Sequence, residues 1–326
     1  MKYSIKQLSE LAHVAQSTVS KALNGQKGVS EEKRREILAL AKEINYTPNA
    51  TARALAHQKT ESIGIVIPST IAFSTTNLFW AEFIVAVAEE ANKQNYNVLL
   101  LIPTKENPLK NIENAIQKKT VDGLIIPAEQ LTIEEINLLT SNEIPFVLQG
   151  KSVLSDACTV DVRNEDGAEK LTRKLVEKGA ESIGCIAGPE SFLYTQERVA
   201  GFKKVLSENN IKIPKIAYAN YDRDSAIEST KSLFKENKNI DSLFIAAGGE
   251  FAFYVFEALK EIRGSAENFP MVIFDDYLPF RYLPYDIIAA RQPIREMGAQ
   301  DTKNLLQMIK GEAVPSLSLF DLKFEN

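Results

Sequence analysis

SIKQLSELAHVAQSTVSKALN, residues 4–24, carries the signals of two short helices joined by a tight connection. Ser4 and Gln7 have the spacing of the capping box that begins a helix, and apolar residues then follow at helical spacing on one face. A second short helix is expected over residues 16–23, because the Asn24-Gly25 pair stops the pattern there. The stretch therefore predicts two consecutive helices with a sharp turn between them.

A third helix is expected directly after this pair. Ser30 is its N-cap, and Glu31 and Glu32 occupy the first turn, where the helix dipole stabilises negative charge. The predicted buried stripe of this helix consists of Ile37, Leu40, Ala41 and Ile44. A helix, a tight turn, a short polar helix and a supporting helix form the helix-turn-helix arrangement, whose second helix lies in the major groove of DNA.

Charge is distributed unevenly along the 326 residues. Residues 1–60 contain 10 lysines and arginines against 5 glutamates, whereas the remainder contains 28 basic against 38 acidic residues. A basic segment on an acidic body is typical of a polyanion-binding module joined to a second domain. The alternative is a merely solvated surface. We predict a DNA-binding domain over residues 1–60 and a second domain over residues 61–326.

From residue 61 onward, short, mostly apolar segments alternate with amphipathic ones. Short apolar runs indicate buried parallel strands, and the longer segments between them indicate helices. Strands are expected at residues 62–68, 97–102, 121–126, 144–148, 182–187, 241–246 and 271–275. The pattern occurs in two runs that divide near Lys151–Val160, which predicts an α/β fold with two doubly wound, parallel-sheet lobes.

Histidine and cysteine are scarce. Both histidines, His13 and His57, lie in the first 60 residues, so the larger domain lacks the base of a Ser-His-Asp or Cys-His mechanism. Two cysteines, Cys158 and Cys185, are too few for a disulfide framework or a four-cysteine zinc site. The Gly-rich phosphate-binding motifs are also missing. We therefore expect no enzymatic activity, no catalytic residue, no metal and no cofactor.

The composition is ordinary for a globular protein, with 44% hydrophobic and 25% charged residues. The sequence contains neither a secretory-signal pattern at its start nor a run of about 18 apolar residues. We expect no membrane association and a cytoplasmic location.

Several motifs of the first 55 residues resemble the lactose/galactose-repressor (LacI/GalR) family of transcription regulators. They are IKQLSELA at residues 5–12, STVSKALN at 17–24, VSEE at 29–32 and NYTPNATARAL at 45–55. Ala15 departs from the family, which usually has serine there as the N-cap of the recognition helix, and losing such a cap costs about 1 kcal/mol. The resemblance implies a sequence-specific regulator, a repressor, that binds double-stranded operator DNA as a homodimer.

The resemblance also implies which residues contact the operator. Gln16, Ser17 and Lys21 lie on the outward face of the second helix, where base edges are read. The resemblance implies that the short hinge helix expected at residues 50–56 orders only on operator DNA in a dimer, and that Leu55 wedges between base pairs in the minor groove. Without the resemblance, this segment would be an ordinary linker. The predicted DNA-contacting residues are Ser4, Gln16, Ser17, Thr18, Ser20, Lys21, Asn24, Asn49, Ala52 and Leu55.

The larger domain resembles the same family and, through it, periplasmic sugar-binding proteins, which hold their ligand between two lobes. The matching motifs are NLFWAE at residues 77–82, VDG at 121–123, RVAGF at 198–202, FDD at 274–276 and RQPIREMG at 291–298. In this fold the chain crosses between the lobes three times, so residues near 292–320 are expected in the first lobe. The resemblance implies a dimerising domain that binds a small-molecule effector, a saccharide.

Ligand contacts follow from these matches position by position. Arg198 corresponds to the family arginine that grips polar groups of the ligand, and Asp275 to the aspartate that accepts hydrogen bonds from it. Aromatic rings would stack on a sugar ring, although core packing is the alternative for Phe79 and Trp80. The predicted effector-binding residues are Phe73, Phe79, Trp80, Arg163, Arg198, Tyr221 and Asp275.

Two departures from the family bear on the ligand. Gly248-Gly249 stands where Asn-Asp is usual, which removes a polar contact, and Arg163-Asn164 stands where Asp-Asn is usual. A cation in place of an anion leaves two ligand classes open, a neutral saccharide and a sugar phosphate. The competing function is a ligand-binding module of the periplasmic type that senses a sugar phosphate or another small metabolite.

Overall fold

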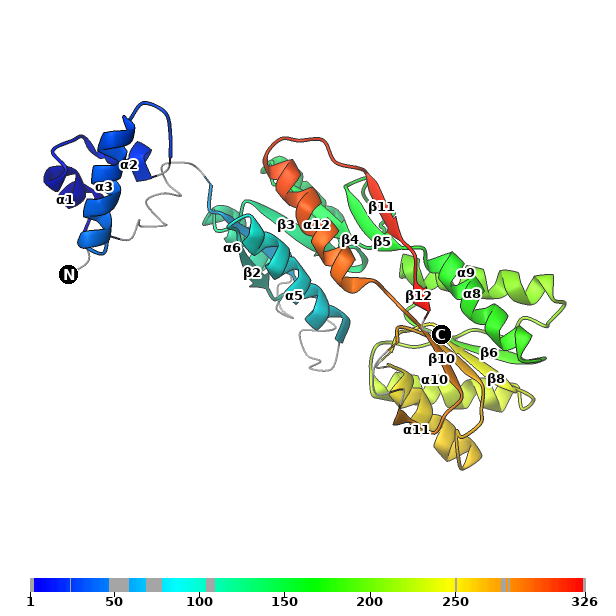
Figure 1. Ribbon diagram of the computed structural model, residues 1–326. Helices are drawn as coiled ribbons and strands as arrows, with labels where there is room; N and C mark the ends of the chain where they lie inside the picture. Colours follow the sequence, from blue (N-terminus) through cyan, green and yellow to red (C-terminus); the bar gives the residue numbers. More distant parts are fainter. Residues whose placement is uncertain are drawn as a thin grey trace. The chain divides into compact units, whose positions relative to one another are not determined.

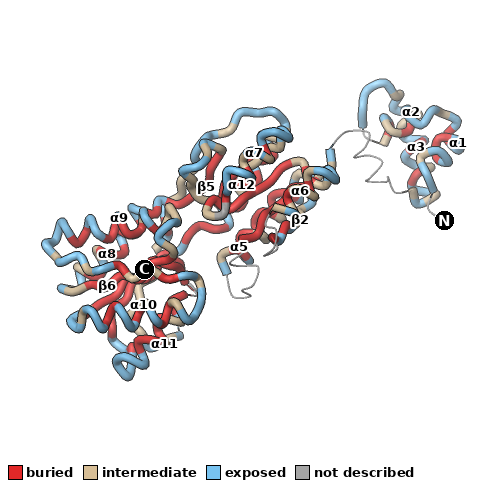
Figure 2. The backbone as a smooth tube through the Cα atoms, turned by 180° about the vertical axis from the view of Figure 1, so that it is seen from behind, coloured by how far each residue is buried: buried red, intermediate tan, exposed pale blue. Residues whose placement is uncertain are grey.

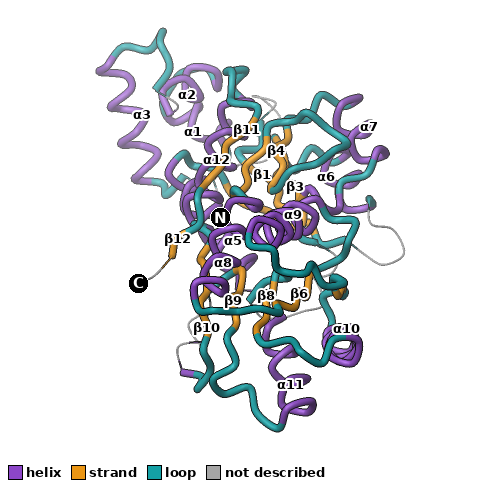
Figure 3. The backbone as a smooth tube through the Cα atoms, turned by 90° about the vertical axis from the view of Figure 1, so that its right-hand side faces the viewer, coloured by secondary structure: helices purple, strands orange, loops and turns teal. Residues whose placement is uncertain are grey.

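The computed structural model describes residues 3–23, 25–46, 59–68, 78–103, 109–249, 251–276, 280 and 282–324. The chain divides into two compact units, Met1–Glu61 and Ser62–Asn326. Figures 1 and 3 show the helices and strands of each unit. The smaller unit has a hydrophobic core of its own.

Helices α1 (Ile5–Leu11), α2 (Gln16–Leu23) and α3 (Glu31–Glu43) build the described part of the N-terminal unit. The predicted capping box of α1 is confirmed, because the Gln7 backbone N–H donates to Ser4 Oγ (3.3 Å) and the Ser4 N–H donates to Gln7 Oε1 (2.8 Å). Ser30 caps α3 as predicted. The buried core consists of Leu8, Ala12, Val19, Ala22, Ile37 and Ala41. Leu40 and Ile44, predicted as buried, are only partly so.

The first sheet of the larger unit is parallel throughout and has the strand order β11-β5-β4-β3-β1-β2. Its strands are β1 (Ser62–Val66), β2 (Asn97–Leu101), β3 (Gly123–Pro127), β4 (Phe146–Gln149), β5 (Thr159–Val162) and β11 (Leu317–Phe320). Helices α5 (Leu78–Lys93) and α12 (Ile294–Ile309) pack on one face, and α6 (Lys110–Gln117) and α7 (Ile133–Ser141) on the other. The 3-10 helix η1 (Ala128–Gln130) follows β3.

The second sheet has the order β12-β10-β9-β8-β6-β7. Its strands are β6 (Ile183–Ala187), β7 (Ala217–Tyr218), β8 (Ser242–Ile245), β9 (Met271–Phe274), β10 (Ile287–Arg291) and β12 (Lys323–Phe324). Helices α8 (Asn164–Glu177) and α9 (Leu193–Glu208) cover one face, and α10 (Arg223–Glu236) and α11 (Phe251–Arg263) the other. The prediction of two doubly wound lobes is confirmed, except that the edge strand β12 runs antiparallel to β10.

The chain crosses between the lobes after Val162, after Arg291 and after Phe320. The first crossing comes later than the division expected near Lys151–Val160, because β5 still belongs to the first sheet. Helix α12 and strand β11 return to the first lobe, as the fold resemblance implies.

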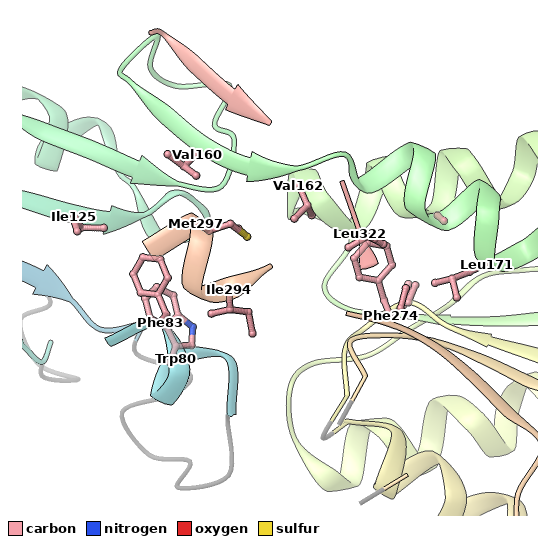
Figure 4. Packing of buried hydrophobic residues seen from close by; sticks show 14 of the residues in the cluster. Trp80, Phe83, Ile125, Val160, Val162, Leu171, Phe274, Ile294, Met297 and Leu322 are labelled. Atoms are coloured by element: carbon pink, nitrogen blue, oxygen red, sulfur yellow. The ribbon is translucent and has the colours of Figure 1, made fainter. Parts of the chain in front are cut away.

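The cores lie on both faces of each sheet, and Figure 2 shows the burial concentrated there. Strands such as β1, β3 and β6 are buried along their whole length because helices cover both faces. In Figure 4, the side chains of Trp80 and Phe83 lie beside Ile294 and Met297 in the first lobe. The same figure shows Leu322, from the last crossing, beside Phe274 in the second lobe.

Gly201 permits helices α8 and α9 to lie unusually close. A Cβ atom at this position would stand 2.3 Å from the Glu165 carbonyl oxygen, which is backbone and cannot move aside. The glycine in the sequence motif at residues 198–202 therefore has a packing reason, because it lets α9, the helix that carries Arg198, lie close to α8.

No helix in the described part of the chain is both long and apolar enough to cross a membrane. Within the same ranges, no group of three or more histidine, cysteine and acidic side chains has an arrangement that could hold a metal ion.

Asp301 is an acidic residue buried inside the first lobe. It lies on α12 with no exposed surface, and neither of its carboxylate oxygens has a hydrogen-bond partner among the described residues. Burial raises the pKa of this carboxyl well above its usual range, and the nearby Asp161 raises it further. The folded state therefore favours the neutral acid, whereas the unfolded chain exposes an ordinary aspartate with a pKa of about 3.9.

We predict that Asp301→Ala stabilises the larger unit at neutral and higher pH. The folded-state pKa of Asp301 is raised, so the folded protein holds this proton more tightly than the unfolded chain does. The stability that the proton gives is fully present below the unfolded pKa and is lost as the pH rises through the folded pKa. Removal of an unsatisfied buried group is worth about 1–3 kcal/mol. Thermal unfolding of the full chain between pH 5 and 8 should show that the unfolding temperature of the variant increases relative to that of the wild type as the pH rises. Asp156→Ala, at an exposed loop position, is the control, and a variant less stable than wild type at pH 8 would contradict the prediction.

Candidate functional site

Helix α2 presents a polar face to solvent and an apolar face to the core. Gln16, Ser17 and Lys21 are exposed, whereas Val19 and Ala22 are buried. The two faces separate because residues three and four positions apart share one side of a helix. The three exposed side chains provide amide, hydroxyl and ammonium groups, the kinds that bond to base edges and phosphates.

Arg34 of α3 holds the C-terminal end of α2. Its Nη1 donates to the carbonyl oxygens of Ala22 (3.1 Å) and Lys21 (3.4 Å), and its Nη2 donates to that of Gln26 (2.6 Å). The last carbonyls of a helix lack partners within the helix and attract positive charge. The arginine therefore fixes the orientation of α2 against α3.

The remaining predicted DNA contacts are only partly described. Ser4 is exposed at the cap of α1, and Thr18 and Ser20 are half-buried on α2. Asn24, Asn49, Ala52 and Leu55 lie outside the described residues, as does Phe73 of the predicted effector site.

Arg198 is the centre of a buried polar network in the larger unit. Its side chain is 5% exposed, its Nε donates to Asn164 Oδ1 (2.9 Å), and its Nη1 donates to the Ala246 carbonyl oxygen (2.8 Å). The guanidinium carbon lies 3.6 Å from the ring centroid of Phe274 and 5.0 Å from that of Tyr194. Ala246 follows β8 and Phe274 ends β9, so the arginine sits at the carboxyl ends of two neighbouring strands, where α/β folds form ligand sites.

Asp275 stands at the same edge of the sheet in a strained conformation. Its φ of +78° is in the left-handed region, and the backbone N–H groups of Asp275 and Asp276 both donate to the Ala290 carbonyl oxygen (2.8 and 3.0 Å). Gln292 Nε2 donates to Asp275 Oδ1 (2.6 Å). Burial raises the pKa of this carboxyl, while Arg198 and Gln292 lower it. A strained backbone conformation of this kind persists only where the surrounding structure holds it in place, and such conformations are frequent at functional sites.

A second carboxyl, Asp161, connects this network to the crossing between the lobes. It accepts hydrogen bonds from the N–H groups of Lys151 (3.2 Å) and Val162 (2.7 Å) and from Asn164 Nδ2 (3.2 Å). Burial raises its pKa to about 6 in spite of these donors. Asn164 thus bonds to Asp161 of the first lobe and to Arg198 of the second. The ion pair between Lys151 and Glu197 of α9 also links the two lobes.

Tyr221 belongs to an aromatic cluster beside Arg198. Its hydroxyl is 2.7 Å from that of Tyr194, and its ring centroid lies 6.5 Å from Phe192 and 6.2 Å from Phe251. Phe192, Tyr194 and Tyr221 are half-buried, so part of each ring remains accessible. Aromatic faces of this kind offer apolar contact to a ring-shaped ligand.

Gly248 leaves room for the Asp275 carboxylate. Its φ is +111°, a conformation that side chains rarely adopt, and a Cβ atom there would stand 3.1 Å from Asp275 Oδ2. The glycine therefore lets the Asp275 carboxylate lie close to the backbone at this position.

The other predicted effector residues do not join the network. Arg163 is exposed, and its Nε lies 3.4 Å from Asp321 Oδ1. Trp80 is 5% exposed and packs edge-on against Phe83, with ring centroids 5.2 Å apart, which agrees with core packing (Figure 4). Phe79 is half-buried and stacks on Phe83 at 5.9 Å.

Sequence reasoning missed Asn164, Gln292 and Glu129 as members of the site. In the sequence, Asn164 is visible only as half of a departure from the family pattern, and its bond to Arg198 depends on a segment 34 residues away in the chain. Glu129 follows β3 at its carboxyl end, and its charge acts on Asp161, Tyr194 and Tyr221. The rule that ligands gather at the ends of parallel strands would have pointed to Glu129.

Comparison with known proteins agrees with both halves of this geometry. The sequence profile described as "Bacterial regulatory proteins, lacI family" matches residues 4–49. A second profile, described as "Periplasmic binding proteins and sugar binding domain of LacI family", matches residues 60–324. The chain belongs to the lacI family. It is therefore a DNA-binding regulator with a ligand-binding domain.

Curated relatives align along nearly the whole of this lacI-family chain. The ribose operon repressor of Halalkalibacterium halodurans is 29% identical over 94% of this chain and 90% of its own length. Catabolite control protein A of Priestia megaterium is 26% identical over 97% of this chain and 95% of its own length. A crystal structure of the lac repressor dimer, bound to operator and the anti-inducer ONPF, has the same fold, with a TM-score of 0.81 at 22% identity over 100% of this chain and 98% of its own.

We predict that Arg34→Ala loosens helix α2 of this lacI-family protein. The substitution removes the charged donor to the carbonyl oxygens of Lys21, Ala22 and Gln26, and among the described residues only the first two also accept from a backbone N–H. Lost hydrogen bonds to a charged group cost about 1.5–3 kcal/mol. Hydrogen exchange of the full chain should be faster in residues 16–23. Arg35→Ala is the matched control, because Arg35 is exposed and, among the described residues, donates to the Glu31 carbonyl oxygen of its own helix. Equal exchange in both variants would show that Arg34 does not hold α2.

Proposed function

We propose that this lacI-family protein represses transcription by binding a specific operator as a homodimer, and that a saccharide bound at the junction of its lobes sets its affinity for DNA. The observation that carries the proposal is the union, in one chain, of a helix with an exposed polar face and a two-lobed unit with a buried polar network at its strand ends. The alternative is a transport-type binding module for a sugar phosphate or another metabolite. That function would not require the N-terminal unit.

DNA recognition is assigned to α2 and to the hinge that follows α3. Gln16, Ser17 and Lys21 would reach base edges in the major groove, with α1 and Ser4 against the backbone phosphates. The hinge residues Asn49, Ala52 and Leu55 would enter the minor groove, and a leucine wedge there would kink the duplex. The basic charge of residues 1–60 supports this assignment.

Effector recognition is assigned to the lobe junction. Arg198 and Asp275 would bond to ligand hydroxyls, since a guanidinium donates and a carboxylate accepts, and Tyr221 would contact the apolar face of the ring. A saccharide fits this mixture of polar groups and aromatic faces, and the name of the ribose operon repressor supports the same ligand class. Arg163, already facing Asp321, offers little support for a sugar phosphate.

The homodimer is supported by an apolar surface on the first lobe. Leu100 and Ile102 lie two residues apart at the end of β2, which is the edge strand of its sheet. Leu78 and Val85 lie seven residues apart on α5, so they share a face of this helix. Each of the four side chains exposes between 46% and 48% of its surface. Edge strands and apolar patches of this kind are places where another chain packs.

We also propose that the protein acts without catalysis, metal or cofactor, and in the cytoplasm, where operator DNA is found. A gel shift with genomic fragments, followed by sequencing of the retained fragments, tests the repressor function. A saccharide that changes the shift would identify the effector class, and sedimentation of the complex would give the number of chains. Retention of no fragment above nonspecific DNA would contradict the proposal.

We predict that Gln16→Ala combined with Ser17→Ala changes the preferred operator. Both side chains are exposed, so folding should be unaffected, and each good base contact is worth roughly 1–3 kcal/mol of discrimination. In vitro selection from random DNA measures the preference. Glu43→Ala, at an exposed position near the end of α3, is the control. Recovery of the wild-type sequence by the double variant would remove these residues from base readout.

We predict that Arg198→Ala and Asp275→Ala each abolish the effect of the ligand on operator binding while the ligand-free affinity for DNA remains. Leaving a ligand group unpaired costs about 1–3 kcal/mol, roughly a fivefold to hundredfold loss of affinity. Calorimetry with the effector found in the gel shift measures this loss. Arg173→Ala, on the surface of α8, controls for the removal of an arginine. Unchanged ligand affinity in both variants would place the effector site elsewhere.

A further inference from the structure

Lys151 and Glu197 form an ion pair between side chains of different lobes. Lys151 lies in the loop between β4 and β5 of the first lobe, and Glu197 lies on α9 of the second. The two side chains are 25% and 21% exposed. Glu197 Oε1 contacts Lys151 Nζ, while Glu197 Oε2 is buried without a hydrogen-bond partner in the described part of the chain. This carboxylate therefore depends on the lysine, because a buried charge is costly unless it is paired.

The ion pair closes a ring of contacts at the lobe junction. The Lys151 N–H donates to Asp161 Oδ2 (3.2 Å), Asn164 Nδ2 donates to Asp161 Oδ1 (3.2 Å), and Arg198 Nε donates to Asn164 Oδ1 (2.9 Å). Glu197 directly precedes Arg198 on α9, so the ring returns through the ion pair to Lys151. Two basic and two acidic side chains belong to this ring, and their formal charges balance. Loss of any one of them leaves a charge uncompensated in a poorly solvated place.

The position of the ion pair distinguishes it from other links between the lobes. Arg291, for example, is the last residue before a crossing, and its bonds to Glu82 of the first lobe (3.3 Å) join residues that the chain itself holds near both lobes. Lys151 and Glu197 are 46 positions apart, and neither stands beside a crossing. The covalent chain therefore does not hold this pair together, and the pair can open when one lobe moves against the other.

We propose that the ion pair of Lys151 with Glu197 is a latch, which stabilises the described arrangement of the two lobes and opposes the change that the effector produces. The inference rests on the proposed function, because it concerns the regulation of the same effector site. Arg198, which would bond to the effector, is the next residue to Glu197 on the same helix, so a ligand that pulls on one also displaces the other. A ligand shifts such an equilibrium only by interacting differently with the two arrangements, and contacts at Arg198 provide that difference.

Spin labels on the full-length protein measure the arrangement of the lobes directly. The native cysteines, Cys158 and Cys185, are 5% and 0% exposed, so a thiol-reactive label attaches to introduced cysteines instead. Asn137→Cys on α7 and Ser207→Cys on α9 place one exposed label on each lobe. Double electron–electron resonance then gives the distribution of distances between the labels. Co-expression with an excess of unlabelled chain ensures that each distance lies within one chain of the homodimer.

Substitutions in this labelled protein test the latch. Lys151→Met removes the cation and keeps the length of the side chain, and Glu197→Gln removes the negative charge and keeps the shape. We expect both to change the distance distribution in the same way, whereas Lys151→Arg, which retains the charge, keeps the wild-type distribution. Lys231→Met is the matched control, because Lys231 pairs with Glu261 inside the second lobe. Circular dichroism establishes that the variants are folded.

Operator binding tests the regulatory role of the latch. Lys151→Met and Glu197→Gln, without labels, should alter the affinity for the fragment retained in the gel shift in the same direction, each by roughly fivefold or more. The variant that combines both substitutions should show the effect of one alone, because the second substitution removes no further interaction. Independent contributions of the two side chains would instead add.

Several results would overturn the inference. An unchanged distance distribution in both single variants, opposite changes in the two, or an equal change in Lys231→Met would each reject a latch between the lobes. Altered distances with wild-type operator affinity, or additive effects in the combined variant, would reject its role in regulation. If the fragment is retained and the variants behave as wild type, only this inference fails. If the distances change as expected but no fragment is retained, the latch stands and the proposed repressor function fails.

Discussion

A permanently charged guanidinium with 5% exposure must find partners inside the protein, and the two-lobed unit is arranged around that requirement. Arg198 starts on α9, bonds to Asn164 just after the first crossing between the lobes, and reaches the carbonyl of Ala246 at the end of β8. Its guanidinium also lies over the ring of Phe274 at the end of β9. Removing one of these partners would leave a buried charge uncompensated, so the crossing and the strand ends hold each other in place.

Asn164 connects the two lobes, because it bonds to a residue of each. Its amide oxygen accepts from Arg198 in the second lobe, and its amide nitrogen donates to Asp161 in the first. The ion pair of Lys151 with Glu197 adds a second link. Central strands of both sheets, such as β1 and β6, are buried along their whole length in close-packed cores. A ligand that bonds to polar groups from both lobes would therefore act on the junction, the part of the unit that depends on a few polar contacts.

The N-terminal unit also depends on an arginine that bonds to carbonyl oxygens from another segment of the chain. Its core contains few large side chains, led by Leu8, Val19 and Ile37, and a domain of this size is only marginally stable. Arg34 supplements that core by bonding to three carbonyl oxygens at and beyond the end of α2. The exposed face of α2 can then consist of polar side chains that contribute nothing to packing and are available for another molecule.

Local patterns determined much of this protein. The capping box at Ser4, the end of α2 before Asn24, the buried strands and the two-lobed plan could all be predicted, because helix caps and apolar periodicity involve residues close in sequence. The expectation that Arg198 and Asp275 lie at the ends of strands came from the family resemblance, and in the structure the Arg198 side chain reaches that edge from α9. Only the tertiary structure decided that Trp80 is buried, that β11 and β12 return to different sheets, and that Asn164 and Gln292 bond to Arg198 and Asp275. Short edge strands lack a long apolar run, and the partner of a buried polar group is chosen by which distant segments the chain brings together, so neither is written in any local stretch of sequence.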